Sequence, residues 1–218
     1  MRKWGLLVCA AALALAAAPR PAEAGDRVGI GVKFGTLGFG LDITGRVNDW
    51  FSVRGTFNAA DADDTHEESG VDYETDVAFG ASGILFDFHP WKKNFRLTAG
   101  WMHNRTGADL LGTPTENVEI GDTVYTPAEA GTISGDVAFK DSAGYVGFGY
   151  GSAARGPGRV RFVLDVGALL QGTGAVTLSS SSGLVSQDDL SKEEQDLEDD
   201  LDDLSFYPVL ALGISFRL

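Results

Sequence analysis

Charged side chains lie within stretches of the sequence that alternate between apolar residues and small or polar ones. They share the parity of the small and polar residues, so a β-strand would place them on the face opposite its apolar side chains. The set is Lys33, Asp42, Arg54, Asp87, Arg96, Arg161, Asp165 and Arg217. Because buried charges need partners, we expect these residues to satisfy one another inside a closed sheet. Ion selection by an open lumen is the alternative.

The three histidines are the other candidates for chemistry. His66 lies among acidic residues, but one histidine among carboxylates is weak evidence for a metal site. His89 precedes Pro90 in a predicted turn, where a structural role is expected. His103 is the best candidate for a catalytic base, yet the sequence places no evident nucleophile beside it. We therefore predict no catalytic residues, no cofactor and no enzymatic activity.

The acidic residues are concentrated in two segments. The chain has 17 basic and 31 acidic residues and a net charge of −14. Residues 61–76 carry eight acids and no base, and residues 187–204 carry ten acids and Lys192. This distribution excludes nucleic acid as a partner and predicts acidic loops displayed to solvent.

The second acidic segment has helical spacing. Leu190, Leu197, Leu201 and Leu204 recur at intervals of seven, four and three residues, and Ser186 with Asp189 resembles a capping box that would start the helix. Its last turns hold Asp199, Asp200, Asp202 and Asp203 at the negative end of the helix dipole, where acids are unfavourable. One interpretation is a solvated amphipathic helix over the mouth of a barrel; the other is a cluster that binds divalent cations. No confident metal site follows.

The elements that position these residues are strands. Residues 208–218 alternate strictly, with apolar side chains at 210, 212, 214, 216 and 218. A strand of about 9–11 residues crosses a bilayer, so the terminal segment predicts a membrane strand. The stretches 28–34 and 37–43 predict a hairpin with Gly35-Thr36 as its two-residue loop, which would pair residue 34 with residue 37.

Five further strands follow from the same alternation. Phe51 to Phe57 is the third, and the acidic residues after it are expected to form a loop. Val77 to Phe88 is the fourth, but Val77 and Phe79 are out of phase with Ile84 and Phe86, which predicts a bulge between Gly80 and Gly83. The others are Phe95 to Trp101, a strand ending at Tyr150, and Phe162 to Leu170 after a turn at Gly156-Pro157-Gly158.

The connections alternate between short and long. Residues 106–132 form a long connection that contains a predicted small hairpin, Val118 to Tyr125, about Gly121-Asp122. An even number of strands, short turns at one end and long loops at the other are typical of outer-membrane barrels. The predicted fold is all-β: an eight-stranded antiparallel transmembrane β-barrel with one acidic helix in the last outer loop. A soluble β-sandwich is the alternative.

The N-terminal residues have the pattern of a secretory signal. Arg2 and Lys3 precede an apolar run, and Ala22-Glu23-Ala24 fits the cleavage pattern. We expect residues 1–24 to be a signal peptide cleaved after Ala24 and residues 25–218 to be the barrel domain. The one cysteine, Cys9, lies within the signal, so the mature chain has no thiol chemistry.

Taken together, these segments resemble small outer-membrane β-barrel proteins of Gram-negative bacteria, an exported group of OmpA- or OmpW-like architecture. The resemblance rests on residues 28–38, on Asp87-Phe88-His89-Pro90, on the acidic helix, and on Tyr207-Pro208-Val209 with residues 213–217. It implies an outer-membrane location and no agreed activity. The chain ends in Leu218, whereas such proteins usually end in an aromatic residue. The His-x-Ser pattern of lipid A deacylases is absent, because residue 105 is Arg.

The predicted function is that of a structural or surface-interaction protein with acidic extracellular loops. The expected partners are outer-membrane lipid and lipopolysaccharide, divalent cations, and the barrel-insertion machinery through the C-terminal strand. We expect a monomer. The alternative is a narrow channel for small or hydrophobic solutes, as in barrels of the OmpW type, and a lipid-modifying barrel enzyme is the third possibility.

Overall fold

The computed structural model describes residues 27–68, 70–154 and 159–218. The predicted signal peptide, its cleavage site after Ala24 and the predicted turn at Gly156-Pro157-Gly158 lie outside these residues. Among the described helices, none has the length and apolar character needed to cross a membrane.

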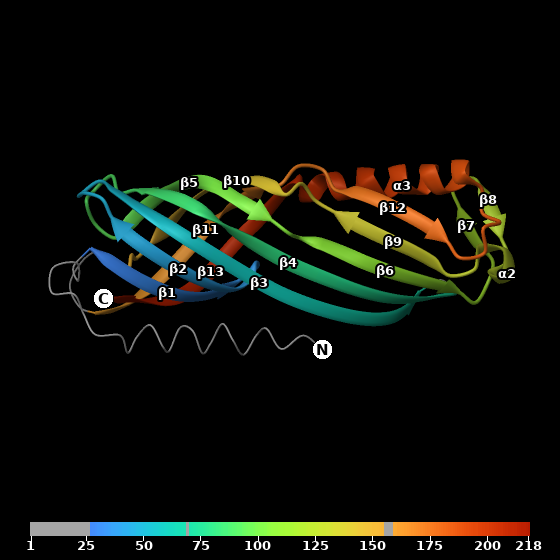
Figure 1. The fold of residues 1–218 in the computed structure, drawn as a ribbon, viewed down its shortest axis with the longest axis horizontal. Coiled ribbons are helices and arrows are strands. Elements are labelled where there is room, and N and C mark those ends of the chain that lie inside the picture. The colour runs from blue at the N-terminus through green and yellow to red at the C-terminus, as the bar shows by residue number, and fades with distance from the viewer. Residues whose placement is uncertain (1–26, 69, 155–158) are drawn as a thin grey trace.

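Antiparallel strands dominate the chain, which confirms the predicted all-β class (Figure 1). A continuous pairing runs from β4 through β3, β2, β1, β13, β11 and β10 to β5, and β5 pairs back onto β4. The bounds of these strands are β1 (Val28–Gly35), β2 (Gly38–Arg46), β3 (Phe51–Glu68), β4 (Val71–Phe88), β5 (Phe95–Asn104), β10 (Ser142–Tyr150), β11 (Val160–Leu170) and β13 (Phe206–Arg217). The sheet therefore closes into a barrel.

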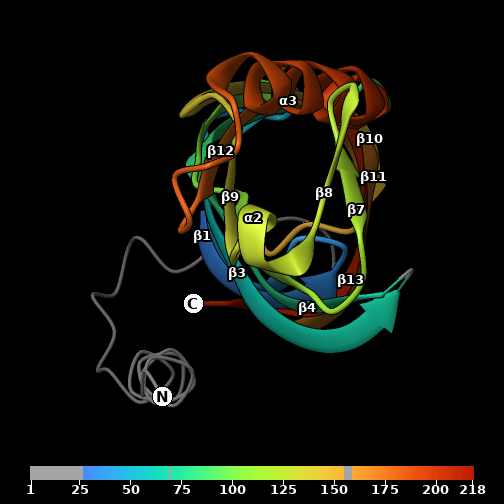
Figure 2. The same ribbon diagram turned by 90° about the vertical axis from the view of Figure 1, so that its right-hand side faces the viewer.

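The long connections build an extension of the barrel wall, at the end away from the C-terminus (Figure 1). There β3 and β4 continue beside β6 (Gly107–Pro114), β9 (Ile133–Ala138) and β12 (Ala175–Ser180), in the order β3-β4-β6-β9-β12. Figure 2 looks onto this end, where α3 (Gln187–Leu201) spans the top. The remaining elements are β7 (Val118–Ile120), β8 (Thr123–Tyr125), α2 (Pro127–Ala130) and the 3-10 turn η1 (Asp202–Ser205). The predicted hairpin over residues 118–125 is confirmed as β7–β8.

The first acidic segment is strand, so its prediction as a loop is wrong. β3 and β4 pair without interruption as far as Glu68 and Val71. Within β4, the exposed Asp72 and Glu74 alternate with the buried Val71 and the half-buried Tyr73. Acidic residues weaken a strand only mildly when every second side chain is solvated. This part of β4 is also hydrogen-bonded on both sides, because β6 pairs with the edge that β3 leaves free.

The predicted bulge in β4 is also wrong. The β3–β4 register is regular from Phe51 opposite Phe88 to Glu68 opposite Val71. Val77 and Phe79 instead face the interior of the extension, whereas Ile84 and Phe86 face outward from the barrel. The apparent change of phase arises because the interior itself changes along the strand, from polar in the barrel to apolar in the extension.

The first hairpin is shifted by two residues from its predicted register. Phe34 pairs with Phe39, and Thr36-Leu37 forms the turn. The side chain of Leu37 is buried in an apolar cluster, which favours this turn over one that would leave Leu37 on the strand face. Gly38 follows with φ of +80°, a conformation that other residues rarely adopt.

The outer surface of the barrel carries a belt of exposed apolar side chains. On β13 the predicted alternation is confirmed, since Leu210, Leu212, Ile214 and Phe216 are exposed whereas Val209, Ala211 and Ser215 are buried. Other strands contribute Val32, Phe34, Phe39, Ile43, Phe57, Ile84, Phe86, Leu97, Trp101, Val146, Phe148 and Phe162. Exposed apolar area of this extent on a closed sheet requires a nonaqueous surrounding or a partner.

The acidic helix begins where the sequence predicts. Ser186 is the N-cap of α3, and its Oγ accepts a hydrogen bond from the backbone N–H of Asp189 at 3.1 Å. The helix runs along the open edge of β12. Glu194 Oε1 accepts from the backbone N–H of Leu178 at 2.7 Å, and Glu198 Oε1 accepts from Val176 at 3.0 Å. These carboxylates occupy the edge donors that another strand would otherwise pair with.

We expect the double variant Glu194→Ala and Glu198→Ala to loosen β12. Charge-assisted hydrogen bonds contribute about 1.5–3 kcal/mol each, so amide hydrogen exchange at Val176 and Leu178 should accelerate by about tenfold or more, since 1.4 kcal/mol corresponds to a factor of ten. The control is Asp196→Ala together with Asp199→Ala, two exposed helix acids. Equal exchange in both double variants would contradict the assignment.

Candidate functional site

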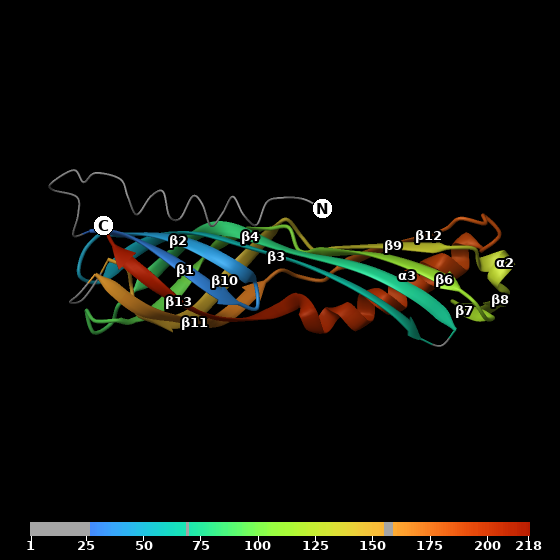
Figure 3. The same cartoon turned by 90° about the horizontal axis from the view of Figure 1, so that it is seen from below.

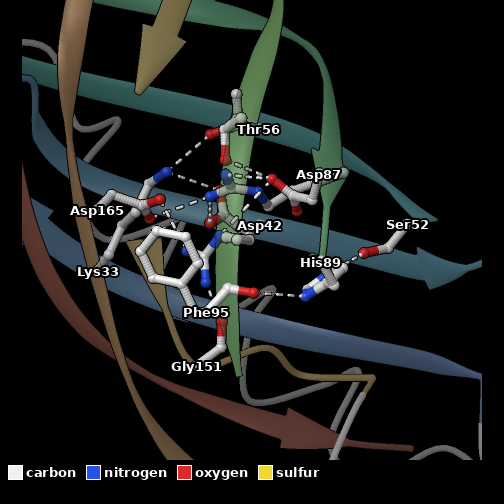
Figure 4. Close-up of polar contacts among 12 residues, drawn as sticks. Lys33, Asp42, Ser52, Thr56, Asp87, His89, Phe95, Gly151 and Asp165 are labelled. Carbon is white, nitrogen blue, oxygen red and sulfur yellow. Dashed lines mark hydrogen bonds and ion pairs between the residues drawn. The ribbon is translucent and has the colours of Figure 1, made fainter. Parts of the chain in front are cut away.

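Six of the predicted charged residues meet in the barrel interior, and Figure 4 shows their polar contacts. Arg54 lies at the centre of this ion network. Its guanidinium nitrogens are 3.1 Å from Asp42, 3.1 Å from Asp87 and 3.0 Å from Asp165. Each partner comes from a different strand, so one side chain links β2, β3, β4 and β11 across the lumen.

Arg96 and Lys33 complete the network. Arg96 is 2.7 Å from Asp165 and 3.6 Å from Asp87, and it donates to the carbonyl of Gly151. Lys33 lies 2.9 Å from Asp42 and donates to Thr56 Oγ1 at 3.0 Å. Three bases balance three acids, so the network is neutral, and all six side chains are buried. Neutral balance and mutual pairing are what make buried charges tolerable.

The other two predicted members, Arg161 and Arg217, lie outside this cluster. Arg161 donates to the carbonyl of Ser152 at 3.1 Å. Both residues belong to the strand ends near the short turns, since β11 begins at Val160 and β13 ends at Arg217. Sequence parity assigns a face to a residue but not its height along the barrel axis, so it could not separate these two from the six.

A strand glycine provides the room that the network needs. A Cβ added at Gly149 would lie 2.8 Å from the Arg96 guanidinium carbon, which is closer than such atoms approach. Glycine in a strand often marks a close approach of this kind. The small residues between apolar ones in this sequence therefore leave space for long basic side chains.

Replacing Arg54 should destabilise the barrel strongly. Arg54→Leu leaves three buried carboxylates with two bases, and removal of one partner of a buried ion pair costs about 3–5 kcal/mol. Urea-induced unfolding in phospholipid vesicles, followed by tryptophan fluorescence, measures the loss. Arg46→Leu, which breaks the exposed Arg46–Asp49 pair, should cost about 0–1 kcal/mol.

A second variant separates charge imbalance from lost packing. Adding Asp87→Asn to Arg54→Leu restores two bases against two acids, so we expect part of the lost stability to return. A double variant less stable than Arg54→Leu alone would show that packing, rather than charge balance, sets the effect.

The histidines lie apart from one another. His89 is fully buried at the β4–β5 turn, where Nε2 is 2.8 Å from Ser52 Oγ and Nδ1 is 3.1 Å from the carbonyls of Lys93 and Phe95 (Figure 4). These contacts agree with the structural role predicted for it. His66 stacks on Tyr73, and His103 Nδ1 is 3.1 Å from the carbonyl of Asp141. No two of them share a site in the described residues.

An apolar cluster closes the lumen beyond the ion network. It consists of Leu37, Ala81, Leu85, Met102, Ala143, Tyr145, Leu169 and Val209, with Tyr207 packed against it. The two voids beside the network measure about 10 Å³ each. A void of this size holds about one water molecule.

Beyond this cluster the extension encloses a chamber of about 540 Å³. Small-molecule sites typically measure about 300–1,000 Å³. Its wall is mainly apolar, with Val77 and Phe79 from β4, Val137 from β9 and Leu178 from β12, while Gln171 and Tyr207 lie at the barrel end. The side of α3 and η1 that carries Leu197, Leu201 and Leu204 covers it. The leucine spacing that predicts the helix therefore marks one wall of a cavity.

The N-terminal end of α3 is attached to the β7–β8 hairpin. Tyr125 Oη donates to Asp189 Oδ2 at 2.7 Å, and Ser186 Oγ donates to the same oxygen at 2.7 Å. Because these bonds stabilise the carboxylate, they lower the pKa of Asp189 to about 2. Glu193 Oε2 accepts from the backbone N–H of Gly121 at 3.0 Å. Together these contacts hold the helix over the chamber.

A lysine adds a further attachment at the same hairpin. Lys192 pairs with Asp122, and the hydrogen bond and the negative charge of that carboxylate raise the pKa of Lys192. Both groups are solvent-exposed, so this pair orients the helix more than it stabilises it.

The attachment at Asp189 should persist to unusually low pH. A carboxyl whose folded pKa is lowered contributes stability above its unfolded pKa of about 4, and the contribution disappears as the pH falls through about 2. A carbon NMR titration of the Asp189 carboxyl should have its midpoint near 2. At pH 7, Asp189→Asn should accelerate hydrogen exchange in the first turn of α3, whereas the neighbouring Asp188→Asn should not. Equal exchange in both variants would contradict this account.

The predicted cation ligands do not converge. Asp199, Asp200, Asp202 and Asp203 lie at the end of α3 and in η1, and all four are exposed. Among the described residues, no group of three or more histidine, cysteine or acidic side chains is arranged to hold a metal ion. Divalent cation binding by this segment stays a prediction.

Comparison with known proteins supports the fold. No protein-family model matches the chain, and a search of curated proteins finds no match. The crystal structure of CarO2 from Acinetobacter baumannii is similar to this chain over 88% of its length and 98% of that protein, with a TM-score of 0.61 and 24% identity. CarO of the same organism covers 88% and 98% with a TM-score of 0.59 and 21% identity. The chain has the fold of these outer-membrane β-barrels, so the predicted resemblance is confirmed at the level of fold.

Sequence reasoning identified the charged residues but missed the chamber. One signal was present in β4, where Val71, Tyr73, Val77 and Phe79 share a parity and belong to the chamber wall. The phase conflict in that strand marked the place where the interior becomes apolar. The matching strands β6, β9 and β12 are short and rich in small residues, and they carry little recognisable alternation.

Proposed function

We propose that this protein is an eight-stranded outer-membrane barrel with a closed lumen, which binds an apolar small molecule in its external chamber. The observation that carries the proposal is the chamber of about 540 Å³ with a largely apolar wall. A cavity that large would be energetically unfavourable if it served only the fold, because empty apolar volume costs stability. The ion network and the apolar cluster separate the chamber from the far end of the barrel.

The membrane location is supported by four observations. The barrel exposes a belt of apolar side chains, and the pairing of its strands leaves no unpaired edge inside that belt, as lipid requires. The fold is shared with CarO and CarO2, and the sequence has the pattern of an export signal. The short turns would then face the periplasm, and the extension would face the exterior.

The alternative function, a narrow channel, has less support. A conducting lumen requires a continuous polar path, whereas this lumen is crossed by paired charges and then filled by Leu85, Met102 and Tyr145. An enzymatic role also lacks a feature to carry it, since His103 has no nucleophile placed beside it by the sequence. Lipopolysaccharide, divalent cations and the insertion machinery remain the predicted partners of the acidic loops and the terminal strand, and the protein is expected to be a monomer.

Planar-bilayer recording tests the closed lumen. Purified protein should insert without stable unit conductance, because paired charges cross the described lumen and the apolar cluster fills it. Reproducible conductance steps would favour the channel.

Photolabelling tests the chamber. A long-chain alcohol bearing a diazirine at the end of its chain, added to protein in lipid nanodiscs, should label residues of β4, β9 and α3 that line the chamber. Val137→Trp, which places a large ring inside, should reduce this labelling by about fivefold or more, whereas Ala138→Trp on the exposed face of the same strand should not. Labelling confined to the outer belt of the barrel would contradict the proposed function.

A further inference from the structure

The strands of the barrel extend to different distances toward the chamber. β1 ends at Gly35 and β2 begins at Gly38, whereas β3 continues to Glu68. On the other side, β13 connects back through η1 into α3. Figure 3 shows the β1–β2 turn between β3 on one side and α3 on the other. The tight first hairpin therefore leaves a notch in the wall.

In the described residues, no strand pairing joins the two borders of the notch. β2 pairs with β3 only as far as Ala59, so the rest of β3 pairs with β4 alone. The helix α3 packs on β12 and β7, at the opposite border of the sheet. The chamber is lined by β4, β6, β7, β9 and β12 and covered by α3 and η1, and none of the described lining residues belongs to β3. We therefore expect its side opening between α3 and β3.

The lip of this opening is apolar. Leu197 and Leu204 line the chamber, yet 37% and 40% of their surfaces are exposed. Below them, the hairpin itself presents Phe34 and Phe39 with 60% and 69% exposed. Exposed apolar side chains are therefore present both on the hairpin and at the chamber wall.

The charged residues of the chamber are all acidic. Glu119, Glu193 and Asp200 line it, and none of the described lining residues is lysine or arginine. A ligand with a negatively charged head would meet uncompensated repulsion there, whereas a positive head would meet complementary charge.

We propose that the chamber takes a single-chain amphiphile with a cationic head group, such as a long-chain alkylammonium, and that the chain enters sideways from the outer membrane leaflet through the notch. The alkyl chain lies against the apolar wall of β4 and β9, and the head lies at the lip near Asp200. This inference rests on the proposed function, since it names the ligand class and the route of that same chamber.

The test compares two photoreactive probes of equal chain length in nanodiscs, one an alkyltrimethylammonium and one an alcohol. Chamber labelling by the cationic probe should exceed that by the alcohol, and Asp200→Asn should lower it by about 2- to 5-fold, the range of an exposed ion pair. Asp200→Asn should leave the alcohol unchanged, and the exposed Asp203→Asn, which does not line the chamber, should alter neither probe.

A variant at the lip tests the route. Leu204→Arg should slow labelling of the chamber by both probes by about fivefold or more, because a charge interrupts the apolar lip. Leu184→Arg, at an exposed leucine that is not part of the chamber wall, should have no effect. Heat-modifiable migration in detergent gels confirms that each variant is folded.

The outcomes distinguish this inference from the proposed function. Labelling of the chamber by the alcohol with no preference for the cationic probe, or with no effect of Leu204→Arg, overturns the ligand class or the route and leaves the chamber as a binding site. A preference for an anionic probe of the same length overturns the ligand class as well. Absence of chamber labelling by every probe overturns the proposed function itself.

Discussion

The backbone pairing that joins β1 to β13 is the constraint on which this structure depends. The two strands lie at opposite ends of the described chain, and their pairing turns a sheet into a ring. A ring has no free edge, so every strand in it can carry apolar side chains on its outer face without exposing backbone donors and acceptors to a surrounding that cannot bond them. The same closure creates an enclosed interior. Whether that interior is polar or apolar changes along the barrel axis.

The interior is organised in three levels along the barrel axis. Near the short turns it is polar, and six charges neutralise one another around Arg54. The next level is apolar and filled, with Leu85 and Met102 almost fully buried. The third level is apolar and unfilled: residues of β4, β6, β7, β9, β12, α3 and η1 line a chamber of about 540 Å³. β4 passes through all three levels, with Asp87 in the ion network, Leu85 in the apolar cluster and Phe79 in the chamber wall.

Several acidic residues of α3 accept hydrogen bonds that attach the helix to its neighbours, which the acidic composition of the segment alone does not predict. Glu194 and Glu198 bond the open edge of β12, Glu193 bonds Gly121, and Asp189 bonds Tyr125. These contacts explain how a helix with so many like charges stays against the sheet, since each carboxylate in contact accepts a hydrogen bond from a donor that would otherwise be unpaired. Asp199, Asp202 and Asp203, at the end of the helix and in η1, are exposed to solvent.

The sequence by itself determined the class of fold, the alternating terminal strand, the start of the acidic helix at Ser186 and the inward parity of the charged residues. Each of these follows from local periodicity or capping, which neighbouring residues impose. The tertiary structure alone decided the two-residue shift of the first hairpin, the continuation of β3 and β4 through acidic residues, the meeting of six charges without Arg161 and Arg217, and the chamber. These depend on the height of a residue along the barrel and on which strand lies beside it, and both are set by pairing between segments far apart in the chain.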